Sequence, residues 1–388
     1  MKITFAKRLQ QLPPYLFAQI DAAKKKAIAE GKDVIDFGVG DPDLATPRPV
    51  IEALHQGALD AENHRYPTTR GLGFLRKAIA QWYEKRFQVY LNPDTEIHSL
   101  IGSKEGIAHA PLAFLNAGDI ALVPDPCYPP YRGGTLFACG RDYLLPLKEE
   151  NRFLPDLERI PSSVVRKAKL LFLNYPNNPT AAVAPLEFLD KVVHFAKRNQ
   201  ILVCYDNAYS EISYDGYQAP SFLQLKGAKE VGVEFHSFSK TYNMTGWRLG
   251  WVSGHPNIVE GIGIVKSNID SGVFQAIQLA GIAALRLPEE FLRQSNQVYQ
   301  ERRDILCEGL KKMGWQINPP RASFYVWSRV PGRMKSTLFA KRFLEEIHVL
   351  VTPGIGFGPS GEGYVRFALT VSVERIREAL GRIEKMIT

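Results

Sequence analysis

The first indication of the fold is a short apolar stretch, Ile201-Leu202-Val203-Cys204-Tyr205, that runs directly into Asp206. A near-continuous apolar run of this length predicts a strand that is buried on both faces. Similar runs occur at 120–123, 170–173, 233–236 and 249–252, with helical patterns between them. This alternation predicts an α/β fold built on a mostly parallel sheet.

The pattern changes in the last quarter of the chain. A charged helical stretch at 289–314 leads into apolar runs at 322–327 and 364–369, which is an α+β pattern. A chain of 388 residues is also longer than one hydrophobic core usually serves. We therefore expect two domains, a large one at 46–286 and a smaller α+β one formed by 1–45 with 287–388.

Composition narrows the class of protein. The apolar fraction of 45% and the charged fraction of 23% are those of an ordinary globular protein. No apolar run approaches the roughly 20 residues that cross a bilayer. The first residues, Met1–Arg8, carry charges where a signal peptide has its apolar core. We expect a soluble, cytoplasmic protein with no membrane partner.

The net charge of +8 raises the question of a nucleic-acid partner. The basic residues are spread along the chain, and the nearest cluster, Lys24-Lys25-Lys26, is typical of a solvated helix face. A cationic balance also suits anionic phosphates and carboxylates. We expect no nucleic-acid partner.

The cysteines are scattered without a C-x-x-C pair, so neither a disulfide framework nor a metal site is expected; they are Cys127, Cys139, Cys204 and Cys307.

Polar residues follow three consecutive predicted strands. The first strand runs into 174–179, the second into Asp206-Asn207-Ala208-Tyr209, and the third into Ser237-Phe238-Ser239-Lys240. Alone, each segment has a plainer explanation, as a turn, a helix cap or a surface lysine. In open α/β sheets, however, ligands bind beyond the carboxyl ends of the strands. Together the three segments predict a site with amides, a carboxylate, a phenol and an amine.

Three motifs are specific enough to compare with the signatures of a known family. The longest reads Ser237-Phe238-Ser239-Lys240-Thr241-Tyr242-Asn243-Met244-Thr245-Gly246-Trp247-Arg248-Leu249-Gly250. With Asn177-Asn178-Pro179-Thr180 and Asp206-x-x-Tyr209, it resembles the signatures of the fold-type-I pyridoxal-phosphate aminotransferases. The resemblance covers the chain from Tyr15 to Arg366. It implies a large domain with a mostly parallel seven-stranded sheet between helices, a smaller α+β domain, and pyridoxal 5′-phosphate as cofactor.

The resemblance assigns roles around the cofactor ring. Lys240 is expected to form the Schiff base and then to move the proton at the substrate Cα. Asp206 is expected to pair with the ring nitrogen, which keeps the ring an electron sink. Asn178 and Tyr209 are expected to hydrogen-bond the ring oxygen, and Tyr128 to stack on the ring.

The cofactor phosphate needs donors and positive charge. Gly102-Ser103-Lys104-Glu105-Gly106-Ile107 opens a predicted helix after an apolar strand, so free N–H groups face an anion there. Standing alone, Gly102-Ser103 is as readily a plain helix cap. By resemblance, Ser237, Ser239 and Arg248 complete the phosphate site with Ser103 and Lys104. Tyr66 matches a tyrosine lent to the neighbouring subunit, which implies a homodimer with shared sites.

Amino-acid and 2-oxo-acid substrates need a carboxylate site. Arg366 matches the arginine that binds the α-carboxylate, a task that suits its planar fork. Gly40 would add a backbone N–H. Several segments, among them 265–272, resemble the LL-diaminopimelate aminotransferase family, in which Tyr15, Lys104, Tyr128 and Asn268 line the substrate pocket. The implied reaction exchanges an amino group between LL-diaminopimelate and 2-oxoglutarate, toward lysine.

Two departures from the relatives bear on that interpretation. Thr68-Thr69-Arg70-Gly71 lacks the acidic residue that many relatives place there, which puts the substrate in question. Ala181 stands where the family usually has glycine, which we expect to leave the chemistry intact. The alternatives that stay open are an aspartate, alanine or aromatic aminotransferase, a pyridoxal-phosphate C–S lyase, and a non-catalytic sensor. The sensor is disfavoured because every catalytic position is filled.

Overall fold

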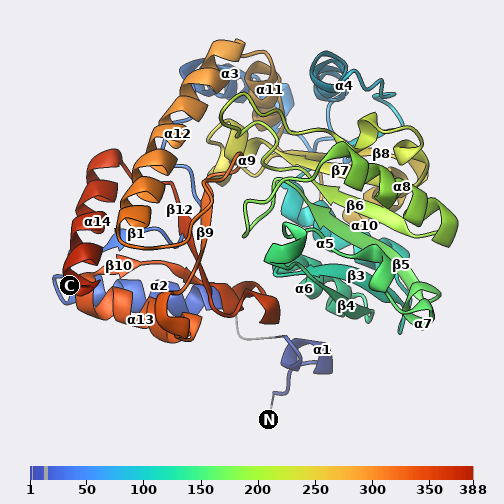
Figure 1. Ribbon diagram of the computed structural model, residues 1–388. Helices are drawn as coiled ribbons and strands as arrows, with labels where there is room; N and C mark the ends of the chain where they lie inside the picture. Colours follow the sequence, from blue (N-terminus) through green and yellow to red (C-terminus); the bar gives the residue numbers. More distant parts are fainter. Residues whose placement is uncertain (2, 13–15, 388) are drawn as a thin grey trace.

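The computed structural model describes residues 1, 3–12 and 16–387. Its main feature is a seven-stranded sheet in the order β2-β8-β7-β6-β5-β3-β4 (Figure 1). The strands are β2 Ile97–Leu100, β3 Ile120–Asp125, β4 Arg141–Pro146, β5 Ala168–Asn174, β6 Leu202–Asp206, β7 Gly232–Ser237 and β8 Gly250–Gly254. Strands β4, β3, β5, β6 and β7 pair in parallel, whereas β8 pairs antiparallel with β7 and β2. The predicted α/β fold with a mostly parallel sheet is confirmed.

Helices cover both faces of this sheet, because side chains of successive strand residues point to opposite sides. Leu171 and Leu173 of β5 belong to one core, and Leu170 and Phe172 to the other. The first core is closed by α3 Arg48–Leu59, α4 Gly73–Phe87, α8 Leu186–Asn199 and α11 Gln275–Leu285. The second is closed by α5 Ser103–Phe114, α6 Pro130–Phe137 and α10 Pro256–Ile269. Burial on both faces explains why the strands read as continuous apolar runs.

A separate core lies on the other side of the molecule (Figure 1). Its strands are β1 Ile35–Asp36 paired with β10 Val349–Leu350, and the antiparallel sheet β11 Thr352–Pro353, β12 Tyr364–Ala368 and β9 Tyr325–Arg329. Its helices are α12 Glu289–Lys312, α13 Ser336–Ile347 and α14 Val373–Ile387. Helix α2 Leu16–Ala29 is joined to β1 by the ion pair of Lys24 with Asp36. Phe37, Tyr299, Phe343 and Ile376 are fully or almost fully buried in it, so residues from both ends of the chain build one core. Short helices complete the chain: α1 Lys7–Gln10, α7 Ser162–Val165 and α9 Phe238–Thr241.

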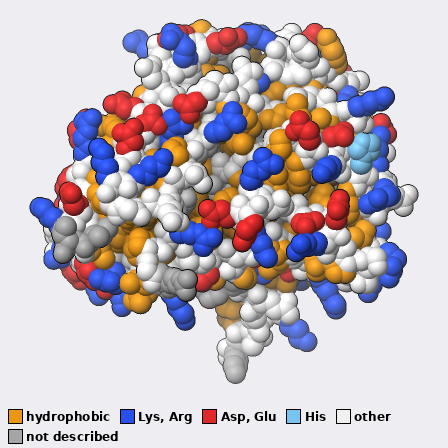
Figure 2. Space-filling view, viewed as in Figure 1, with side chains coloured by type: hydrophobic (Ala, Val, Ile, Leu, Met, Phe, Trp, Pro, Cys, Tyr) orange, Lys and Arg blue, Asp and Glu red, His pale blue; other side chains and the backbone are white. Residues whose placement is uncertain are grey.

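The surface carries both signs of charge. Figure 2 shows Lys and Arg side chains interspersed with Asp and Glu on the visible face. Many charged side chains of the molecule pair, as Arg342 does with Glu346 and Arg375 with Asp33. Among the described residues, no helix is long and apolar enough to span a membrane.

The turn after β5 holds the alanine that departs from the family pattern. Ala181 has φ +56°, in the left-handed region that glycine adopts at least cost. The turn is closed all the same, because Ala181 N–H donates to Asn177 O at 2.9 Å and Asn177 N–H donates to Ala182 O at 2.9 Å. The alanine keeps the turn at a conformational cost of about 1 kcal/mol.

Candidate active site

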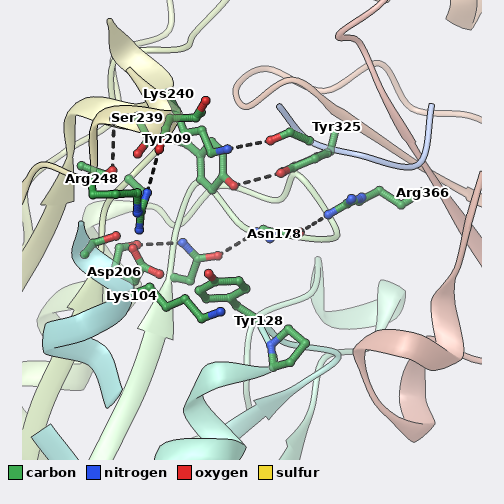
Figure 3. Close-up of a pocket in the computed structure, with 17 residues that line it drawn as sticks. Lys104, Tyr128, Asn178, Asp206, Tyr209, Ser239, Lys240, Arg248, Tyr325 and Arg366 are labelled. Carbon is green, nitrogen blue, oxygen red and sulfur yellow. Dashed lines mark hydrogen bonds between the residues drawn. The ribbon is translucent and has the colours of Figure 1, made fainter. Parts of the chain in front are cut away.

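A pocket of about 220 Å³ opens at the carboxyl ends of β5, β6 and β7 (Figure 3). These strands are adjacent and parallel, with Asn174 paired in register to Asp206, so their ends meet at one edge of the sheet. The chain places polar residues at each end: Asn174 closes β5, Asp206 closes β6 and Ser237 closes β7. The polar residues that follow the three predicted strands are thus brought together at one edge of the sheet.

Most of the predicted site residues line this pocket. They are Gly40, Ser103, Lys104, Tyr128, Asn178, Asp206, Tyr209, Ser237, Ser239, Lys240, Arg248 and Arg366. Tyr66 and Asn268 are absent from its wall: Tyr66 is 93% exposed, and exposed Asn268 donates to Ile264 O of its own helix at 2.8 Å. Tyr15 lies outside the described residues.

The carboxylate of Asp206 is buried at the floor of the pocket. Tyr131 donates its hydroxyl to Oδ2 at 2.8 Å, and among the described residues nothing hydrogen-bonds Oδ1. Burial raises the pKa of Asp206 to about 6, although Tyr131, the nearby backbone N–H of Ala208 and His236 lower it. A buried carboxylate oxygen without a partner is costly, so this atom marks a place for a donor or a cation.

The amine of Lys240 enters the same pocket from α9. Its Nζ donates to Gly40 O at 2.6 Å. Burial lowers the pKa of Lys240 to about 8; Asp41 opposes this change, and Arg366 and Arg248 add to it. A lowered pKa makes a larger fraction of the amine neutral, the form that attacks a carbonyl and accepts a proton.

One wall of the pocket is suited to an anion. Helix α5 begins at Ser103, with Gly102 as its N-cap at φ +75° and no side chain capping the helix. A Cβ at Gly102 would overlap the Arg248 guanidinium, so glycine lets this cation lie against the helix start. Ser237 and Ser239 complete the wall. Free N–H groups, hydroxyls and a guanidinium in one place form a phosphate-type site.

The opposite wall presents a buried guanidinium. Arg366 is 3% exposed and comes from β12; its Nη1 donates to Asn178 Oδ1 and its Nη2 to Gly38 O, both at 2.8 Å. Burial lowers the pKa of Arg366, although nearby Tyr325 and Tyr209 raise it. The guanidinium is therefore held in place by the segment around Gly38 and by the turn after β5.

Three further residues around the pocket were not among the predicted site residues. Tyr131 bonds Asp206, and Tyr325 lies against Arg366 and Tyr209. Asn174 donates to Asp206 O at 2.8 Å and accepts from Asn178 N–H at 2.7 Å. Asn174 had a signal, since it opens the polar segment after a predicted strand. Tyr325 lies in the apolar run 322–327, and nothing in the sequence singled out Tyr131.

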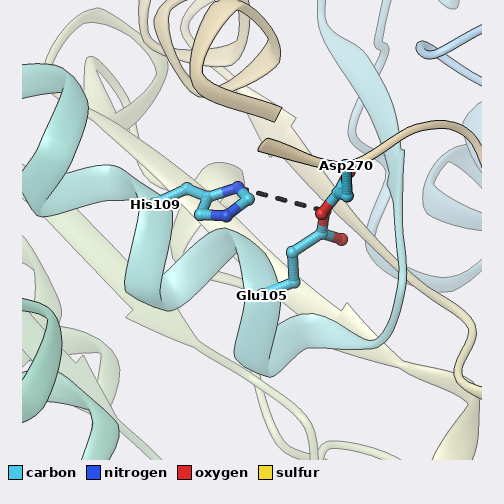
Figure 4. A group of neighbouring side chains, drawn as sticks. All are labelled: Glu105, His109 and Asp270. Carbon is cyan, nitrogen blue, oxygen red and sulfur yellow. Dashed lines mark ion pairs between the residues drawn. The ribbon is translucent and has the colours of Figure 1, made fainter. Parts of the chain in front are cut away.

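A charged cluster lies behind the start of α5 (Figure 4). Lys266, fully buried, donates to Glu105 Oε1 and Asp270 Oδ1, each at 2.6 Å, and His109 Nδ1 lies 3.9 Å from Glu105 Oε1. Burial raises the pKa of Glu105 to about 7; Asp270 adds to this rise and Lys266 opposes it. Glu105 also accepts from Ile101 N–H. Carboxylates and histidine are metal-ligand types, but here the lysine supplies the positive charge and ties α10 to the anion-binding wall.

The pocket can be tested against the requirements of pyridoxal phosphate. That cofactor needs an amine for its aldehyde, a carboxylate for its ring nitrogen, and donors with positive charge for its phosphate. Lys240 offers the amine, the unpartnered Oδ1 of Asp206 the carboxylate, and the wall of α5 and Arg248 the phosphate site. The residues present fit the group.

Comparisons with known proteins agree with this geometry. The model of the family "aminotransferase class I and II" matches residues 32–383. The chain is 55% identical to LL-diaminopimelate aminotransferase from Moorella thermoacetica, with 98% of each chain covered. It is 53% identical to the enzyme of that name from Aquifex aeolicus, with coverage of 98% and 99%. The structure of apo BacF from Bacillus subtilis superposes with a TM-score of 0.96, at 39% identity, with 100% and 99% of the two chains covered.

The lowered pKa of Lys240 gives a first prediction. In cofactor-free protein, the amine should react with an acylating reagent with a midpoint near pH 8, because below that pH it is protonated and unreactive. Arg366→Met should raise the midpoint, since it removes a nearby positive charge. Mass spectrometry of the Lys240 peptide across about pH 6 to 11 measures both effects. A midpoint near 10.5 in both proteins would contradict the enclosed site.

Proposed function

The chain belongs to the aminotransferase class I and II family, and from that premise we propose that it exchanges an amino group between LL-diaminopimelate and 2-oxoglutarate. Enzymes of this family depend on pyridoxal phosphate and act on small amino acids and 2-oxo acids. The proposal rests on two observations together: one pocket brings an amine, a buried carboxylate and an anion-binding wall close to one another, and full-length relatives bear this name. We also propose that the enzyme is cytoplasmic and that it takes part in lysine synthesis.

The proposal gives each residue of the inner pocket one task. When bound, pyridoxal phosphate supplies an electron sink for the negative charge that develops at the substrate Cα. Lys240 would hold the cofactor and would then carry the proton from the substrate Cα to the cofactor C4′. Asp206 keeps a proton on the ring nitrogen through its unpartnered Oδ1. Asn178 and Tyr209 bind the ring oxygen, and Tyr128 packs on the ring.

The outer residues orient the molecules that bind. Ser103, Ser237, Ser239 and Arg248 would hold the phosphate, because they line one wall together with the start of α5. Across the pocket, Arg366 would bind the α-carboxylate of the substrate by both oxygens, with Gly40 N–H beside it.

The far end of a long substrate needs its own contacts. Lys104 is exposed on the first turn of α5 and lines the pocket near half-buried Tyr128 (Figure 3). Its ammonium is suited to a second carboxylate, as diaminopimelate has. Tyr15 and Asn268 complete the substrate contacts in the proposal.

A homodimer with shared sites is part of the proposal. Tyr66 is 93% exposed, and further apolar side chains are exposed near the end of α10 and the start of α11, namely Ile264, Ile269 and Phe274. Gly272 packs directly on Pro67 and Thr68, so these segments form one surface. A second copy covering this surface would explain the exposure, and would let Tyr66 and Asn268 serve the site of the partner.

The loop at 68–71 favours a second candidate. The loop, Thr68-Thr69-Arg70-Gly71, contains no acidic residue for the distal ammonium of diaminopimelate, and its Arg70 pairs with Glu260. An aspartate, alanine or aromatic amino-acid aminotransferase needs no such acid, and the same pocket would serve it. A C–S lyase on this fold would release pyruvate from a cysteine derivative without any keto acid.

Substrate assays separate these candidates. Purified enzyme with LL-diaminopimelate and 2-oxoglutarate should form glutamate, and Lys240→Ala should abolish both this exchange and the visible absorption of the bound cofactor. Rapid exchange with aspartate or phenylalanine, without exchange from diaminopimelate, would show that the proposed substrate is wrong and that the enzyme is still an aminotransferase. Pyruvate from a cysteine derivative alone would favour the lyase.

Mixed dimers test the sharing of sites. Lys240→Ala, which should be inactive alone, and Tyr66→Ala, which should be weakly active, should regain about a quarter of wild-type activity after unfolding and refolding together, because half the dimers are mixed and each has one intact site. As control, Lys240→Ala mixed with Arg248→Ala should regain nothing, since both residues belong to one pocket. No regain in dimers shown by native mass spectrometry to be mixed would place Tyr66 outside the partner site.

A further inference from the structure

Tyr325 lies in the wall of the pocket, and no task above includes it. It begins β9, is 2% exposed, and extends from the sheet of the smaller core into the pocket (Figure 3). It therefore brings a side chain of that core next to residues that follow β6 of the large sheet.

The hydroxyl of Tyr325 has one polar contact. It lies 3.0 Å from the hydroxyl of Tyr209, which is 6% exposed, and either oxygen can be the donor. Among the described residues, neither hydroxyl has another hydrogen-bond partner. The two rings meet edge to face at 5.5 Å, which fixes the contact.

The ring of Tyr325 has a second neighbour. The guanidinium carbon of Arg366 lies 4.1 Å from the ring centroid, a cation–π geometry in a buried place. The hydroxyl end packs so closely on Gly40 that a Cβ there would overlap it. One tyrosine thus touches Tyr209 on the cofactor side, and Arg366 and Gly40 on the carboxylate side.

We propose that Tyr325 is a positioning residue with two separable parts: its hydroxyl donates to Tyr209, and its ring supports Arg366. This inference rests on the proposed function, in which Tyr209 binds the ring oxygen of the cofactor and Arg366 binds the substrate carboxylate.

The direction of the hydrogen bond follows from proton count. Tyr209 has one hydroxyl proton, and in the proposed function that proton goes to the ring oxygen. The Tyr209 oxygen then accepts from Tyr325, and donating and accepting hydrogen bonds in a chain strengthen each other. Tyr325 thereby makes Tyr209 a better donor to the cofactor, while its ring keeps the guanidinium plane toward the pocket.

Tyr325→Phe removes only the hydroxyl. The weakened Tyr209 donor leaves more charge on the ring oxygen, so the nitrogen that joins Lys240 to the cofactor keeps its proton to a higher pH. We expect the pH midpoint of the visible absorption to rise by about half a unit. The dissociation constant of succinate, a dicarboxylate that cannot react, should stay within about twofold, because the ring remains.

Tyr325→Leu removes the ring as well. It should show the same rise in midpoint and, in addition, bind succinate about tenfold more weakly in a spectral titration, because Arg366 loses its aromatic support. The difference between the two variants separates the hydroxyl from the ring.

Two controls make the test specific. In a Tyr209→Phe background, Tyr325→Phe should add no further shift, since it acts through Tyr209. Tyr214→Phe, which removes another buried hydroxyl that donates to Ser323 O at 2.7 Å, should change neither measurement. An unchanged midpoint in Tyr325→Phe, an additive shift in the double variant, or wild-type succinate binding in Tyr325→Leu would overturn the proposal. A wild-type protein without a visible band would overturn the proposed function and this inference together.

Discussion

Asp206 ends β6 and lines the pocket; Tyr131 hydrogen-bonds one of its carboxylate oxygens, and the other is buried without a hydrogen bond among the described residues. Burying a carboxylate in this way opposes ionisation, and its pKa rises to about 6. Such a destabilising group is typical of a functional site, where a bound cation can stabilise the ionised carboxylate. The rest of the pocket is arranged around this half-satisfied group.

Three polar contacts join the two sides of the pocket. Lys240 donates to Gly40 O, Arg366 donates to Asn178, and Tyr325 meets Tyr209. Each contact pairs a residue around the large sheet with one from the smaller core or from the N-terminal segment that runs beside it. The positions of the amine, the ring-oxygen donors and the carboxylate fork therefore depend on how the two cores pack.

Much of the fold and the site could be predicted from sequence, for physical reasons. Doubly buried strands are continuous apolar runs, and the residues that end them, Asn174, Asp206 and Ser237, are local in sequence. Tyr325 could not be found in this way, because its neighbours are distant in sequence: β9 pairs with β12, and the side chain of Tyr325 contacts Arg366 and Tyr209. Lys266 was missed for a related reason: a lysine on a helix reads as exposed, and only the packing of α10 on α5 brings it to Glu105 and Asp270.

The most direct measurement of the central claim is the free energy of unfolding of wild type and Asp206→Asn, in urea, from about pH 5 to 8, with and without pyridoxal phosphate. The pKa of Asp206 is raised from 3.8 to about 6, so cofactor-free wild type loses stability as the pH rises from about 4 to about 6, and the loss levels off above that. Without cofactor, Asp206→Asn should become the more stable protein by on the order of 3 kcal/mol at pH 8. With cofactor, this advantage should vanish or reverse, because the ionised carboxylate gains its partner. An equal difference with and without cofactor would contradict the account.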